Sequence, residues 1–168
     1  VDAYCEYGFF ACELYNCIVY FNQAPEGANY GVFRYTADII QFAYSCTTPL
    51  PPGLGNIAAD PQLISATHLS PASPCIGAGS SAYVQGADTD GEPWASPPAM
   101  GADQPGAPNG PLNVWIEASL TNVATGYPIA FTAFNTGPNQ QSVWDFGDGT
   151  LLTNQPFASH IWAVPRAH

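Results

Sequence analysis

The chain has 168 residues, a formal net charge of −11 and only 9% charged residues; it contains no Lys, and its two Arg are Arg34 and Arg166. Nucleic acids and anionic membrane surfaces bind through basic patches, so this composition excludes both as expected partners. The apolar fraction of 46% is high enough for a folded core.

Turn-forming residues and large apolar side chains recur throughout, with 16 Gly, 17 Pro, nine Tyr and nine Phe. No long amphipathic stretch with helical spacing interrupts them, so short strands between turns are expected and the fold class is all-β. Five Cys in a chain without Lys favour an oxidising setting. We therefore expect a secreted protein that is extracellular or held at the cell surface.

Two apolar segments near the N-terminus, residues 14–22 and 37–46, are the first strand candidates. Aligning Cys17 with Cys46 also places Tyr15 over Tyr44 and Asn16 over Ser45. A repeat of this length is typical of stacked, solenoid-like coils.

Residues 14–104 resemble the end of bacterial right-handed parallel β-helix proteins of the choice-of-anchor group. The resemblance rests on an ordered series of motifs: Asn16–Tyr20, Tyr44–Pro49, His68-Leu69, Ser73–Gly79, Asp88–Pro93 and Met100–Asp103. Trp94 departs from the Arg usual in that group. The resemblance implies terminal coils and a cap over residues 1–104, followed by a Pro/Gly linker at 105–111.

The C-terminal region begins with two alternating segments, residues 112–118 and 128–134, and continues with strand candidates at 142–146 and about 158–163. Trp144-Asp145-Phe146-Gly147-Asp148-Gly149-Thr150 then closes a strand into a tight turn. This string resembles the signature of the PKD domain, an immunoglobulin-like sandwich of extracellular proteins. Residues 112–168 are shorter than the ~100 residues of such sandwiches, and the strands that the family places last are missing. The expected architecture is therefore a short right-handed parallel β-helix end followed by an incomplete PKD-like sandwich.

Candidate metal ligands are few. Asp88 and Asp90 alternate in an Asp-x-Asp-Gly turn whose carboxylates could converge on calcium, although an Asx-rich turn without an ion is the simpler interpretation. Asp145 and Asp148 carry the same two interpretations. None of the three His residues has a ligand partner nearby in the sequence.

No catalytic motif is evident. The chain lacks a nucleophile elbow, a phosphate-binding loop and the cations that a uronate lyase needs, and only Asp38 and Asp60 suggest a hydrolase pair. We therefore expect no enzymatic activity and no catalytic or cofactor-binding residues.

Two disulfides are expected among the five Cys. Cys46 and Cys75 lie inside the β-helix resemblance and flank the last coil and the segment that wraps it, so we expect them to pair. Cys5 and Cys12 form the next pair, with Cys17 left over.

The function that these features favour is a non-catalytic structural or adhesive module that assembles into a homo-oligomer. Missing sandwich strands would leave Trp144, Phe146 and Trp162 partly uncovered, and a strand from Val1–Phe10 of a neighbour would complete the sandwich. Phe9 and Phe10 belong to a dense aromatic N-terminus that suits an interface, a sugar-stacking surface or simply the core of the coils. Head-to-tail donation generates a filament. The alternative is the accessory C-terminal part of a secreted β-helix polysaccharide-degrading enzyme, or a carbohydrate-binding module.

Overall fold

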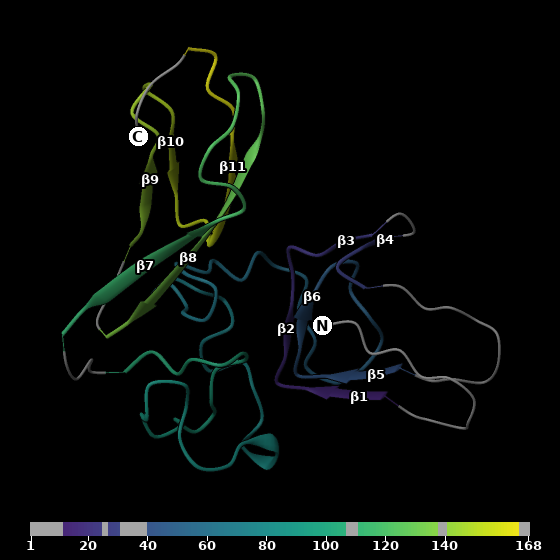
Figure 1. The fold of residues 1–168 in the computed structure, drawn as a ribbon. Coiled ribbons are helices and arrows are strands. Elements are labelled where there is room, and N and C mark those ends of the chain that lie inside the picture. Colours follow the sequence, from purple (N-terminus) through teal and green to yellow (C-terminus); the bar gives the residue numbers. More distant parts are fainter. Residues whose placement is uncertain (1–11, 25–26, 31–39, 107–110, 138–140, 165–168) are drawn as a thin grey trace.

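The computed structural model describes residues 12–24, 27–30, 40–106, 111–137 and 141–164. Within these ranges the chain forms eleven short strands and one 3-10 turn, with no α-helix (Figure 1). The all-β expectation is therefore confirmed for the described residues.

The N-terminal segments pair in parallel, one after another. Strand β1 (Cys12–Tyr15) lies beside β5 (Ile40–Ala43), and β2 (Ile18–Val19) lies beside β6 (Cys46–Thr47). Antiparallel β3 (Gln23–Ala24) and β4 (Gly27–Ala28) form a small ribbon next to them. Parallel stacking of successive segments is the arrangement that the repeat predicted.

The register of this stacking differs by one residue from the predicted alignment. Cys46 pairs with Ile18 instead of Cys17, and Cys12 pairs with Ile40. Asn16 and Tyr44 both take a left-handed conformation with φ of 52°, so each predicted strand is broken at an equivalent corner. The sequence alignment did not locate these matching corners.

A right-handed parallel β-helix is not shown by these elements. The described part of the chain contains two short parallel ladders and one further parallel bridge, between Cys46 and Ile57. Residues 48–106 are mostly loops that wrap one apolar core; its buried members are Cys46, Leu63, Leu69, Cys75, Ala99 and Met100.

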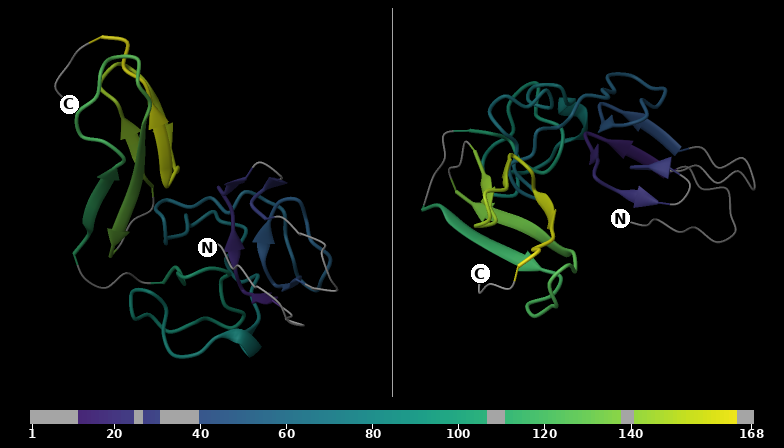
Figure 2. Two further views of the ribbon diagram at one scale, coloured as in Figure 1. Left: turned by 45° about the vertical axis from the view of Figure 1, so that its right-hand side comes forward. Right: turned by 90° about the horizontal axis from the view of Figure 1, so that it is seen from above.

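The C-terminal segments form two facing antiparallel layers (Figures 1 and 2). One layer has the order β11 (Phe157–His160), β8 (Ile129–Thr136), β7 (Asn113–Ala118), and the other pairs β9 (Val143–Asp145) with β10 (Leu151–Thr153). Trp144, Phe146 and Ala158 are buried between the layers, with Phe131 and Trp162 packed against them. This is the immunoglobulin-like sandwich expected of this region.

Two residues outside the sandwich, Ala66 in the loops of residues 48–106 and Phe21 after β2, contact it directly. The backbone N–H of Ala66 donates to the carbonyl of Ala133 on β8 at 3.0 Å. The ring of Phe21 packs edge-on against Phe157 on β11, with centroids 5.8 Å apart.

Candidate functional site

The Asp-rich turn after β9 is held by its own side chains. The Asp145 carboxylate accepts the N–H of Gly147 at 2.9 Å, and the Asp148 carboxylate accepts that of Thr150 at 3.0 Å. Asp148 also meets His160 Nε2 at 2.7 Å. These carboxylates act as turn braces, which is the simpler of the two interpretations that the sequence left open.

Hydrogen bonding sets the charge state of this turn. The N–H of Thr150, together with His160, lowers the pKa of the Asp148 carboxyl to about 2. Asp148 therefore links the turn to β11 as an anion.

The aromatic side chains expected to lack cover are mostly inside the sandwich. Trp144 is 8% exposed and Phe146 is 5% exposed, so the prediction that these two rings are left uncovered is wrong. Trp162 is half-buried. Phe131 and Trp162 pack around Phe146, and the indole N–H of Trp144 donates to the Gln155 carbonyl at 2.6 Å. Trp144 and Phe146 thus belong to the module's own core and offer little surface to a partner.

One run of exposed apolar side chains lies on β7. Every residue of this strand is exposed, and β8 pairs with only one of its edges. The surface that we call the β7 edge consists of Leu112, Val114, Trp115 and Ile116, each between 46% and 61% exposed. Exposed apolar edge strands readily accept a further strand.

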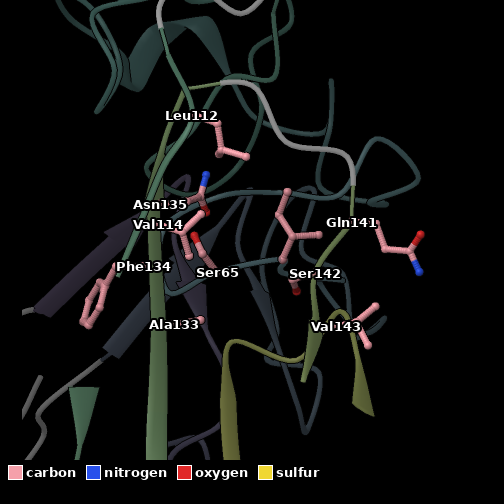
Figure 3. A pocket seen from close by; sticks show the side chains of 10 residues that line it. Ser65, Leu112, Val114, Ala133, Phe134, Asn135, Gln141, Ser142 and Val143 are labelled. Atoms are coloured by element: carbon pink, nitrogen blue, oxygen red, sulfur yellow. The ribbon is translucent and has the colours of Figure 1, made fainter. Parts of the chain in front are cut away.

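A pocket of about 180 Å³ lies at one end of the sandwich, between the loop region and both layers (Figure 3). Ile64 and Ser65 come from the loops, Val114 and Asn135 from β7 and β8, and Ser142 from the segment before β9. Asn135 is 3% exposed, and neither of its amide atoms has a hydrogen-bonding partner in the described structure. Buried amides without partners are rare, which makes Asn135 the main polar feature of this pocket among the described residues.

A second polar cluster lies in the loop region. His68 Nε2 is 2.8 Å from Asp90 Oδ2, and one ligand-type atom from each of His68, Asp90 and Asp103 lies within 4.8 Å of the others. Asp88, which the sequence grouped with Asp90, instead accepts the backbone N–H groups of Asp90 and Glu92. The sequence thus predicted one member, Asp90, of a cluster whose other members are distant in the chain.

Of the two predicted cysteine pairs, only Cys46 and Cys75 both lie within the described residues. Cys46 and Cys75 are both fully buried free thiols that lie in hydrogen-bonding contact. This contact and burial raise the pKa of the Cys46 thiol. Cys12 and Cys17 are also free thiols. The structure therefore places Cys46 beside Cys75 as predicted but contains no bond between them.

Cys5, Phe9, Phe10, Asp38 and His168 lie outside the described residues. Asp60, the other member of the suggested hydrolase pair, accepts the backbone N–H of Gln62 at 2.8 Å.

Comparison with known families supports the sandwich assignment. Residues 113–168 match the family model of the PKD domain. This domain is an extracellular structural and adhesive module, compatible with a non-catalytic role. No curated protein and no solved structure matches the chain. No helix in the described ranges is long and apolar enough to cross a membrane.

Proposed function

We propose that the chain is a secreted, non-catalytic structural module that associates with further copies of itself through the β7 edge. The observation that carries this proposal is that every residue of β7 is exposed and that one edge of the strand has no partner among the described residues. In this proposal, the parallel ladders in residues 12–47 are the terminal coils of a β-helix.

The distribution of charge also favours the β7 edge as the surface for self-association. Two copies that each carry a net charge of −11 repel one another over most of their surfaces. The β7 edge carries no ionised side chain among Leu112, Val114, Trp115 and Ile116, and Glu117 is its nearest acidic neighbour. Two copies that meet there bury apolar area without placing many carboxylates face to face.

Strand addition is the geometry that fits this edge. The backbone groups of β7 that face away from β8 are available to an incoming strand, which would extend the three-stranded layer. The segment Val1–Phe10 is the proposed donor, because it is rich in aromatic residues. Donation from one copy to the next builds a chain of subunits.

Light scattering over a concentration series tests the proposal. We expect the intact protein to form oligomers, and added salt to strengthen association because it screens like charges. Lys residues blunt a sheet edge, so Val114→Lys with Ile116→Lys should give a monomer. Leu54→Lys, at a loop position that is 69% exposed, is the matched control and should leave assembly unchanged.

Removal of residues 1–10 separates the donor from the acceptor. Loss of oligomers in the truncated protein would support donation by this segment. Oligomers that persist would exclude Val1–Phe10 as the donor, and an intact protein that stays monomeric at every concentration and salt level would contradict self-association.

A further inference from the structure

His68, Asp90 and Asp103 bring three ligand-type side chains together from three separate loops. Their ligand-type atoms lie within 4.8 Å of one another, and no other such group of three occurs in the described ranges. His68 and Asp103 are buried, whereas Asp90 is exposed at the rim. The cluster therefore has a fixed inner side and an outer side that faces solvent.

Neighbouring groups orient the two buried members. His68 Nδ1 lies 2.8 Å from Thr67 Oγ1 and 3.1 Å from Ser65 Oγ, and the Asp103 carboxylate accepts the N–H of Leu69 at 2.9 Å. A hydroxyl oxygen can accept a hydrogen bond from Nδ1–H, and in that tautomer Nε2, which faces the Asp90 carboxylate, carries the lone pair that binds a cation. Support of the second ring nitrogen in this way is typical of histidines that bind metals.

The charges of the cluster do not balance. Burial, with smaller contributions from the nearby carboxylates of Asp88 and Asp90, raises the pKa of the Asp103 carboxyl. The chain has no Lys, and neither Arg lies in the described ranges. His68 is thus the one basic side chain beside these carboxylates within the described structure. A bound cation would supply the positive charge that these carboxylates lack.

We propose that His68, Asp90 and Asp103 bind one divalent transition-metal ion of the zinc class. The imidazole nitrogen favours such an ion over calcium or magnesium, which prefer oxygen ligands alone. Three protein ligands leave a fourth position for water.

A small movement of Asp90 would accommodate the ion. His68 Nε2 and Asp90 Oδ2 form a direct contact of 2.8 Å. Tetrahedral ligands about 2.1 Å from zinc lie roughly 3.4 Å apart, so the two atoms must separate by about half an ångström. Asp90 can make this adjustment because its side chain is 21% exposed and lies in a turn.

The sandwich provides a matched control. His160 and Asp148 form a similar pair, with Nε2 and Oδ2 2.7 Å apart, but they belong to no group of three in the described structure. A general affinity of His–Asp pairs or of an acidic surface for cations would affect both places equally. Specific binding should depend on the loop cluster alone.

Titration of the full-length, metal-stripped, reduced protein with Zn²⁺ in a calorimeter tests the site. We expect one ion per chain. Asp90→Asn and Asp103→Asn keep a hydrogen-bond acceptor at each position, and each should lower the affinity at least about tenfold. Asp148→Asn should bind as the unaltered protein does. Binding that is absent, or that survives both loop substitutions, would overturn the proposal.

Free thiols are the main competitors for zinc in this chain, so Co²⁺ serves as a spectroscopic probe. Nitrogen and oxygen ligands give the visible bands of four-coordinate Co²⁺ without the near-ultraviolet band of a Co²⁺–thiolate bond. That spectrum, recorded on the unaltered protein, supports the site even if a variant fails to fold. A thiolate band at one equivalent of Co²⁺ would assign the ion to cysteine and overturn the proposal.

Discussion

Asp148 serves two segments of the sandwich at once. One carboxylate oxygen accepts the N–H of Thr150 within the turn, and the other contacts His160 at the end of β11. The sequence predicted the turn because Gly147 and Gly149, with φ of 72° and 94°, and the two Asp residues are local signals. It did not predict the contact with His160, which depends on how β11 packs.

The lowered pKa of Asp148 predicts a pH dependence of stability. Its folded-state pKa is about 2, below the ordinary value of 3.8, so ionised Asp148 stabilises the folded state above pH 4. That contribution is lost as the pH falls from about 4 to about 2. Asp148→Asn should therefore unfold more easily at neutral pH, and its difference from the unaltered protein should shrink across this window. Denaturant unfolding at several pH values checks this, and a constant difference would contradict it.

The contact between the Cys46 and Cys75 thiols predicts that the two can form a disulfide bond. Because the two thiols already touch in the core, we expect oxidation to join them with little rearrangement. Closing the loop of residues 47–74 should add about 3 kcal/mol to the free energy of unfolding. Peptide mapping without reductant, with Cys75→Ser as the control, checks the bond. Free Cys46 in fully oxidised protein would exclude it.

Strand β9 contributes a buried ring, Trp144, to the core of the sandwich. Trp144 points inward and is 8% exposed, whereas its neighbour Val143 is 55% exposed. Trp144→Ala should destabilise the sandwich by about 3–5 kcal/mol because it removes a buried ring and the bond to Gln155. Val143→Ala should cost less than about 0.5 kcal/mol. Thermal unfolding followed by tryptophan fluorescence compares the two, and equal effects would show that β9 is not packed as described.

The strands of the sandwich were more predictable than those of the N-terminal parallel ladders. Predicted segments 112–118, 128–134, 142–146 and 158–163 each contain or overlap an observed strand, because alternation and turn residues are local signals. Strand β10 was missed since Leu151–Thr153 is short and mostly exposed. Between the strands of the N-terminal ladders, Asn16 and Tyr44 take positive φ although neither is glycine, so the sequence did not mark these corners.

Contacts between distant segments set the limit of prediction for the whole molecule. The cluster of His68, Asp90 and Asp103 is assembled by the packing of loops that are distant in the chain. The spacing of these residues in the sequence therefore does not predict it. The burial of Trp144 and Phe146 similarly depends on Phe131 from another strand and on Trp162. Sequence patterns therefore identified the sandwich, whereas the loop cluster and the packing of the sandwich core depend on contacts that only the fold shows.

Amide hydrogen exchange of β7, measured at low and high protein concentration, tests self-association through the β7 edge most directly. The amides of Asn113–Ala118 that do not bond to β8 should exchange quickly in dilute solution. They should become protected at high concentration in the intact protein and stay unprotected in the Val114→Lys, Ile116→Lys variant. Unchanged exchange of β7 in samples that light scattering shows to be oligomeric would contradict the account, because association would then use another surface.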